Sequence, residues 1–314
     1  MRGELKVFSG SSHPDLARAI CEYNEIPLGN AEIIRFSNEN IMVRLMENVR
    51  GADVFVVQTS CPPVNEGVME LMIMIDALRY ASAERITAVI PYFPYVRSDK
   101  KDKPRISITA RLIADLLQTA GADRVLTMDL HSPQIQGFFH MPIDQLIAAP
   151  LICDYFRGKD ISNTVLVAGD VGESKSIGRY ANRLNLPIAI IDKRRDDDDE
   201  KAKAVHLIGD VEGKDALIID DEVASGGTLV EAIHFLKKHG VNNISAAAVH
   251  PVLSGHAIER LRQTELEELV VTDSIPLQAK RSQYDKFHVL SVAPLLGDAI
   301  MRIHNADSIS KLFR

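Results

Sequence analysis

The sequence predicts an α/β protein in which two domains of similar size each contain a mainly parallel sheet flanked by helices. Short apolar runs rich in β-branched residues alternate with stretches of helical periodicity, which is typical of parallel strands joined by crossover helices. This alternation begins again after about Pro150, and 314 residues suffice for two medium-sized cores. Both halves also contain an apolar strand that ends in acidic residues, RVLTMDLH and DALIIDDE.

The first predicted domain covers residues 1–148. Its strands are predicted at 5–9, 31–37, 53–59, 85–91 and 124–130, and its helices at 68–82 and 108–121. The alternation of strands and helices predicts that these strands form one parallel sheet.

The second predicted domain covers residues 149–314. Its strands are predicted at 164–170, 187–192, 204–209, 215–221, 244–250 and 267–273, and its helices at 174–185, 228–240 and 256–263. A last helix at 294–305 could pack on either domain, including the N-terminal one.

Composition excludes several classes of protein. The chain is 46% hydrophobic and 25% charged, as expected of a soluble globular protein. No apolar run is long enough for a membrane helix, and MRGELKVFSG lacks the apolar core of a signal peptide, so we expect a cytoplasmic protein. A net charge of -7 argues against nucleic acid as the main partner. Cys21, Cys61 and Cys153 are too few and scattered for a disulfide framework or a zinc site.

The most informative stretch is DALIIDDEVASGGTL, residues 215–229. A buried strand over 216–219 ends in Asp220 and Asp221, and a turn of small residues then opens a helix near Thr228. Amide groups of such a turn, at the positive end of a helix, can close around a phosphate, while the carboxylates face hydroxyl groups or a cation. The alternative is an N-capped α/β turn with two solvated acids.

Polar residues follow other predicted strands, at the edge where α/β proteins bind ligands. Asp129 and His131 alternate onto one side of the chain and could hold Mg²⁺ on a phosphate, although a histidine satisfied by hydrogen bonds is the alternative. Asp170 follows the strand TVLVAG. The string GDVGESKS resembles a Walker A loop, but Ser174 stands where that motif needs glycine, so we reject a P-loop.

Two basic segments could bind phosphates. Lys193, Arg194 and Arg195 follow a strand and suit an anionic transition state, although a surface cluster neutralised by the acidic residues 196–200 is the alternative. Residues 95–105 are a long basic segment between a strand and a helix, which predicts a mobile loop that closes over phosphates.

Together these segments resemble the ribose-phosphate pyrophosphokinase family, from Leu5 to Phe313. The resemblance is carried, in the family's order, by VRGADVFVVQ, PPVNEGVMELMIMIDALRYASA, ITAVIPYFPY, DRVLTMDLHSPQIQGFF, DKRR, DDEVASGGTL, HPVLSGHAIERL and LSVAPLLGDAIMRIHN. It implies two domains of the phosphoribosyltransferase type and Mg²⁺-dependent transfer of pyrophosphate from ATP to the C1 hydroxyl of ribose 5-phosphate. It also implies regulation by phosphate or ADP and a homo-oligomer, usually a hexamer.

The resemblance also implies roles for individual residues. It places ribose 5-phosphate on Asp220, Asp221, Ala224, Ser225, Gly226, Gly227 and Thr228. It places ATP on Phe36, Asn38, Glu39, Asn40, Arg97 and Ser98. It implies that Asp129, His131 and Asp170 hold magnesium, and that Lys193, Arg195 and His131 serve the transfer itself.

Several positions depart from the family pattern. Ala224 stands where an acid is common, Asn38-Glu39-Asn40 replaces a usual DGE, and Ser98 replaces Gln. The family resemblance also links the segments that hold Arg50, Arg79 and Ser82 to regulation by phosphate and ADP. Asn48, near these segments, replaces a usual Ser. These departures motivate one alternative, a non-catalytic regulatory homologue, and a phosphoribosyltransferase, which shares the phosphate-binding turn and consumes the product, is another. The retained charged residues of the transfer site favour an active enzyme.

Overall fold

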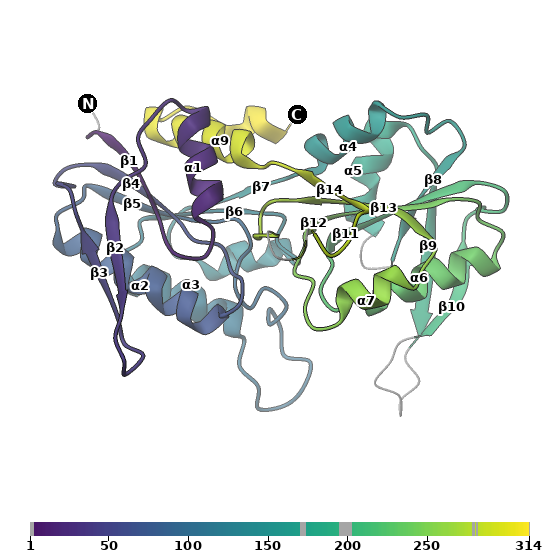
Figure 1. Ribbon diagram of the computed structural model, residues 1–314, viewed down its shortest axis with the longest axis horizontal. Coiled ribbons are helices and arrows are strands. Elements are labelled where there is room, and N and C mark those ends of the chain that lie inside the picture. Colours follow the sequence, from purple (N-terminus) through teal and green to yellow (C-terminus); the bar gives the residue numbers. More distant parts are fainter. Residues whose placement is uncertain (1–2, 170–173, 195–202, 278–279, 281, 314) are drawn as a thin grey trace. The chain divides into compact units, whose positions relative to one another are not determined.

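The computed structural model describes residues 3–169, 174–194, 203–277, 280 and 282–313. The chain forms two compact units (Figure 1). The first comprises Met1–Ile147, Ser274–Pro276 and Ser291–Arg314, and the second comprises Ala148–Asp273 and Leu277–Leu290. Both units contain mainly parallel sheets flanked by helices, so the predicted fold class is confirmed.

The first unit is built on a five-stranded parallel sheet of order β1-β4-β5-β6-β7. Its strands are β1 Leu5–Ser9, β4 Asp53–Val57, β5 Arg85–Ile90, β6 Arg124–Met128 and β7 Ile143–Leu146. Its helices are α1 Pro14–Tyr23, α2 Val64–Tyr80, α3 Thr109–Ala120 and α9 Ala293–Asn305. In Figure 1, α1 and α9 lie on one side of this sheet and α2 and α3 on the other. The strands β4 and β5 are almost wholly buried, as expected for a parallel sheet covered on both faces.

The strand expected at 31–37 is present but is not part of the parallel sheet. It forms β2 Ala31–Arg35, which pairs antiparallel with β3 Ile41–Leu45 as a separate two-stranded hairpin. The turn between them is too short for the crossover that a parallel pair requires. The hairpin packs Ile33, Val43 and Leu45 against the core of the first unit.

The second unit contains a seven-stranded sheet of order β10-β9-β8-β11-β12-β13-β14. All its strand pairs are parallel except the edge pair β10 and β9. Its strands are β8 Thr164–Ala168, β9 Ile188–Arg194, β10 Lys203–Ile208, β11 Asp215–Glu222, β12 Ile244–His250, β13 Leu266–Thr272 and β14 Phe287–Leu290. Its helices are α4 Ala149–Arg157, α5 Ser174–Leu184, α6 Gly227–Lys238 and α7 Ala257–Arg262.

The last long helix, α9, packs on α1 in the first unit (Figure 1). Tyr23 Oη donates to Asp298 Oδ1 at 3.2 Å, and a Cβ at Gly297 would lie only 2.7 Å from the Tyr23 ring. At the end of α9, His304 Nδ1 lies 2.8 Å from Oδ2 of the buried Asp53, which also receives two hydrogen bonds from Arg85. Tyr23 and Asp53, two side-chain partners of α9, therefore come from the beginning of the chain.

None of the helices in the described ranges is long and apolar enough to cross a membrane. The cysteines are free thiols, and burial raises the pKa of Cys21 and Cys153 to about 11. Such thiols stay protonated near neutral pH and are poor nucleophiles.

Candidate functional site

The carboxyl end of β11 carries the two adjacent carboxylates that the sequence singles out. The backbone N–H of Asp221 donates to Asp220 Oδ1 at 2.8 Å, and the N–H of Glu222 donates to Asp221 Oδ1 at 2.9 Å. Asp220 and Asp221 are half-buried, whereas Glu222 is buried. The local hydrogen bonds fix both carboxylates at the strand end, where ligands of α/β sheets bind.

Backbone hydrogen bonds hold the turn that follows β11, which we call the 220–228 turn. The carbonyls of Val223 and Ala224 accept from the N–H groups of Leu253 and Ser254, at 2.8 and 2.9 Å. The Ser225 carbonyl accepts from Nη1 of Arg260, at 3.1 Å. The chain after β12 thus supports the turn from outside.

Gly226 lets this turn pass directly into α6. Its φ of 75° lies in the left-handed region, so a side chain there would be strained, and an added Cβ would be in van der Waals contact with the Ala257 carbonyl oxygen at 3.4 Å. No side chain in the described chain caps α6. The first amide groups of a helix have no partner within the helix and carry its partial positive charge, so they can bind an anion.

Asp129 and His131 follow β6 in the first unit. The N–H of Asp129 donates to the Leu146 carbonyl at 3.0 Å, and Asp129 has a φ of 32°, which is uncommon outside glycine. His131 is exposed and Asp129 half-buried, with the buried Leu130 between them. Within the described residues, no group of three or more His, Cys, Asp or Glu side chains is placed to hold a metal ion.

The basic segment 193–195 is described only in part, and its first two residues lie within β9, whereas the sequence placed them after a strand. The backbones of Lys193 and Arg194 pair with β10, opposite Ala204 and Lys203. The side chains of Lys193 and Arg194, and all of Arg195 and Asp170, lie outside what the structure describes.

The adenine-side residues inferred from sequence form the tip of the β2–β3 hairpin. The N–H of Phe36 donates to the Asn40 carbonyl at 2.9 Å, and the N–H of Asn40 donates to Asn38 Oδ1 at 3.2 Å. Glu39, at the place where the family commonly has glycine, has a φ of 67°. The Phe36 side chain is 49% exposed, so its ring is available for stacking with a base.

Arg97 and Ser98 begin the loop of residues 95–105. Arg97 is exposed and lines a cavity of about 400 Å³ together with Tyr92, Tyr95 and Lys100. Ser98 lines the same cavity, and its hydroxyl also closes the base of the loop, because it accepts from the N–H of Thr109 at 3.3 Å. The N–H of Ala110 donates to the Ser98 carbonyl at 3.2 Å, so Ser98 joins the start of α3 to the loop.

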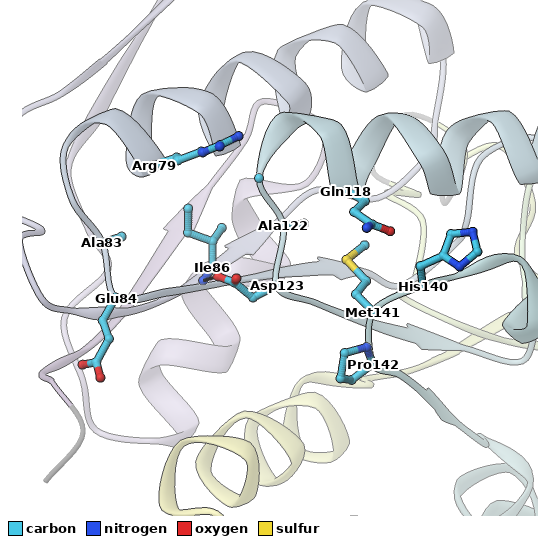
Figure 2. A pocket seen from close by; sticks show the side chains of 11 residues that line it. Arg79, Ala83, Glu84, Ile86, Gln118, Ala122, Asp123, His140, Met141 and Pro142 are labelled. Atoms are coloured by element: carbon cyan, nitrogen blue, oxygen red, sulfur yellow. Dashed lines mark hydrogen bonds between the residues drawn. The ribbon is translucent and has the colours of Figure 1, made fainter.

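A larger cavity, of about 500 Å³, lies at the amino ends of β5, β6 and β7 (Figure 2). This is the opposite edge of the sheet from Asp129 and His131. Its lining includes Arg79 and His140, together with the acids Glu84 and Asp123. Asp123 already accepts a hydrogen bond from the N–H of Ile86, at 2.7 Å. The mixture of charges points to no single class of ligand.

The segments linked to regulation by resemblance lie side by side in the first unit. The N–H of Gly51 donates to the Ser82 carbonyl at 2.8 Å, and the N–H of Arg50 donates to Asn48 Oδ1 at 3.1 Å. Asn48 therefore braces the turn that contains Arg50. A Ser at this position would reach the same N–H less well because its side chain is shorter.

Sequence reasoning missed Glu70, a buried polar residue of the first unit. Glu70 lies on α2 and is completely buried, although its neighbours in the sequence are apolar. An acid inside an apolar helical run is a signal, because burying it requires compensating hydrogen bonds. Those hydrogen bonds come from Ser11 and Gln58, at the ends of β1 and β4.

Comparisons with known proteins span the whole chain. Residues 5–121 match the model of the N-terminal domain of ribose phosphate pyrophosphokinase, and residues 199–314 match that of the phosphoribosyl synthetase-associated domain. The ribose-phosphate pyrophosphokinase of Caldanaerobacter subterraneus subsp. tengcongensis is 50% identical over 310 residues, which cover 98% of each chain. That of Corynebacterium ammoniagenes is 47% identical over 313 residues, covering 100% of this chain and 98% of the relative.

The fold agrees with these matches. A crystal structure of phosphoribosylpyrophosphate synthetase from Mycobacterium smegmatis superimposes with a TM-score of 0.91 and 38% sequence identity, over 96% of this chain and 99% of that one.

Proposed function

The chain belongs to the ribose-phosphate pyrophosphokinase family, and we propose that it transfers the β,γ-pyrophosphoryl group of ATP to the C1 hydroxyl of ribose 5-phosphate. The observation that carries this proposal is the 50% identity with a relative of that name over 98% of both chains. The products are 5-phosphoribosyl 1-diphosphate and AMP. A non-catalytic homologue is not favoured, because the relatives are named as pyrophosphokinases, and a phosphoribosyltransferase is not favoured, because those relatives match both halves of the chain.

In this reaction the C1 oxygen of the sugar forms a bond to the β-phosphorus of ATP. The bond between that phosphorus and the oxygen bridging it to the α-phosphate breaks, and AMP leaves with the bridging oxygen. The proton of the C1 hydroxyl passes to solvent. Such a transfer needs alignment of the reacting groups and stabilisation of charge, and no side chain has to act as a nucleophile.

We assign the sugar phosphate to the 220–228 turn. The amides at the start of α6, after Gly226, would hold the 5-phosphate, with Ser225 and Thr228 exposed beside them. Asp220 and Asp221 would accept from the sugar hydroxyls and orient them. Ala224 lacks the acid common in the family, so its contribution is limited to the backbone carbonyl that accepts from Ser254.

We assign ATP to the first unit, with the base at Phe36 and Asn38–Asn40 and the phosphates near Arg97. Phe36 offers an exposed ring, and Arg97 offers a guanidinium at the edge of a cavity. Ser98 would act on ATP indirectly, since its hydroxyl holds the base of the loop. Lys193 and Arg195 are proposed to stabilise the charge of the pyrophosphoryl group in flight.

The residues proposed to bind metal fit a Mg²⁺ ion that binds together with the nucleotide, coordinated by its phosphates. Asp129 and His131 supply few protein ligands, and Mg²⁺ is usually held by one or two side chains together with substrate phosphates. When bound, the ion would neutralise triphosphate charge. Asp170, outside the described residues, completes the set proposed from sequence.

The test is release of AMP from ATP by purified protein with Mg²⁺ and ribose 5-phosphate. Lys193→Ala should lower the rate by about 100- to 1,000-fold, since it removes a charge aimed at the transition state. Circular dichroism should show an unchanged fold. No AMP release with any of Mg²⁺, Mn²⁺ or added phosphate would refute the proposed activity.

The family assignment also leads us to propose a homo-oligomer, which is a hexamer by family resemblance. Light scattering would test this.

A further inference from the structure

The support of the 220–228 turn depends on the peptide group between Val252 and Leu253, which follow β12. The N–H of this group, that of Leu253, donates to the Val223 carbonyl at 2.8 Å. The next N–H along the chain, that of Ser254, donates to the Ala224 carbonyl at 2.9 Å. Because Val223 directly follows β11, the orientation of the 252–253 peptide group helps to set the position of the turn.

Leu253 has an unfavourable backbone conformation. Its φ of 47° lies in the left-handed region, which costs free energy for a residue that carries a side chain. A flip of the 252–253 peptide group by about half a turn would bring this φ back to a negative value, where the strain is relieved. The same flip would turn the Leu253 N–H away from the Val223 carbonyl. Other contacts must therefore hold the peptide group in its strained orientation.

Lys280 holds the other end of the same peptide group. Its Nζ donates to the Val252 carbonyl at 2.8 Å, and its side chain is half-buried. A hydrogen bond from an ammonium group is stronger than one between neutral groups. The backbone N–H of Lys280 donates to the carbonyl of the buried Leu277 at 2.7 Å, so the side chain extends from an anchored backbone. A flip of the peptide group would break the bond to Lys280 as well as the bond to Val223.

We propose that Lys280 is a positioning residue for the sugar phosphate, because it holds the 252–253 peptide group in the orientation that supports the 220–228 turn. This inference rests on the proposed function, since it takes the turn as the binding site of ribose 5-phosphate. Lys280 itself need not contact the sugar phosphate. When the peptide group flips, Val223 loses a hydrogen bond and the turn samples other positions. The apparent affinity for ribose 5-phosphate then falls to the fraction of molecules in which the turn is in place.

The effect should appear in binding before it appears in stability. Leu253 and Leu277 belong to one hydrophobic core cluster of the second unit, and this packing does not require the Lys280 ammonium group. The strand β12 also keeps its backbone pairing with β11 and β13. Loss of the Lys280 hydrogen bond therefore frees the peptide group without unfolding the unit.

Steady-state kinetics of Lys280→Met test the proposal, because methionine keeps a long apolar side chain but removes the charged donor. We expect the KM for ribose 5-phosphate to rise about fivefold, which corresponds to a turn in place in about one-fifth of the molecules. The KM for ATP should not change, and kcat should stay within about twofold. Lys280→Arg should recover part of the loss, because it keeps a charged donor.

Lys286→Met is the matched control. The Nζ of Lys286 also donates to a backbone carbonyl, that of Leu266 at the start of β13, which is the opposite edge of the sheet from the 220–228 turn. This variant should leave both KM values unchanged. An unchanged KM for ribose 5-phosphate in Lys280→Met would overturn the proposal. So would a rise of the same size in both variants, which would indicate a general loss of stability.

Hydrogen exchange separates this inference from the proposed activity. The amide of Leu253 should exchange more than about fivefold faster in Lys280→Met than in the wild-type protein, and at the wild-type rate in Lys286→Met. If the wild-type protein released no AMP, the proposed function would fail, yet this difference in exchange would still be expected. Equal exchange of Leu253 in the two variants would refute the role of Lys280 by itself.

Discussion

The two candidate substrate segments are built in different ways. In the second unit, the 220–228 turn is held mainly by backbone hydrogen bonds from the chain after β12 and by the left-handed conformation of Gly226, with one further bond from the Arg260 side chain. In the first unit, side chains fasten the hairpin tip and the 95–105 loop to α2, through Arg35 and Tyr95. Replacing a side chain leaves backbone bonds in place, whereas it removes a side-chain bond outright.

This difference indicates which departures from the family pattern matter most. Ala224 still offers its carbonyl to Ser254, so the turn keeps its shape without the usual acid. Glu39 changes the hairpin tip more, because a side chain with a φ of 67° is strained where glycine would not be. We therefore expect altered ATP binding before altered binding of the sugar phosphate.

The largest effect is expected from a change in the backbone of the turn. Gly226→Val introduces a β-branched residue in the left-handed region, with its Cβ in contact with the Ala257 carbonyl oxygen. We expect kcat/KM for ribose 5-phosphate to fall by about 100-fold, because the amides at the start of α6 are displaced from the phosphate. Steady-state kinetics with varied ribose 5-phosphate measure this.

Gly213→Val is the control for Gly226→Val. Gly213 has a similar φ of 69°, but an added Cβ would meet no atom within 4 Å, and the residue lies before β11. It should lower stability by the strain alone and leave the KM for ribose 5-phosphate unchanged. Equal kinetic losses in the two variants would contradict the backbone account of the turn.

A side-chain cluster elsewhere in the second unit tests whether the 220–228 turn depends on distant side chains. Glu268 on β13 receives hydrogen bonds from Lys159 at 2.6 and 2.7 Å and from Tyr155 at 2.8 Å. Burial raises the pKa of the Glu268 carboxyl, but the hydrogen bonds from Lys159 and Tyr155 outweigh burial and hold this pKa below its ordinary value of 4.5. The carboxylate therefore stabilises the folded unit near neutral pH.

We expect Glu268→Ala to lower stability by about 2 to 3 kcal/mol at pH 7, less than for a fully buried pair because the Lys159 side chain is 40% exposed. Since the pKa is lower in the folded state, this contribution is lost as the pH falls from 4.5 through the folded pKa. The melting temperature of the wild-type protein should thus fall more steeply in acid than that of the variant. The KM for ribose 5-phosphate should not change, and a marked rise would mean that the turn also depends on distant side chains.

The smallest effect is expected at the hairpin tip. Glu39→Gly should relieve left-handed strain and slow hydrogen exchange at residues 36–40 by an amount equivalent to about 1 kcal/mol. Glu32→Gly, an exposed position inside β2, should have the opposite sign, because glycine weakens a strand interior. If both substitutions speed exchange, the tip is not strained at Glu39.

Much of the fold could be predicted because its signals are local. The buried strands β4, β5 and β11 each contain a short run that is mostly apolar, and α6 ends where Gly240 follows its last turn. The short strands β7 and β14 were not predicted, and β7 carries the polar Asp144 and Gln145, which hide its strand pattern.

The candidate site was predicted unevenly for the same reason. The carboxylates and the glycine of the 220–228 turn are adjacent in sequence, so their chemistry could be recognised without a structure. The contacts of the buried Glu70 could not be predicted, since Glu70 meets Arg35 and Ser11 only after α2 packs beside the sheet.

The sequence by itself determined the α/β class, the polar strand ends and the membership of the family, because each depends on residues close together along the chain. Only the tertiary structure decided that β2 and β3 form a separate hairpin, that α9 packs on α1, and that α2 supports both proposed nucleotide segments. Those arrangements depend on contacts between residues far apart in sequence, which no local pattern specifies.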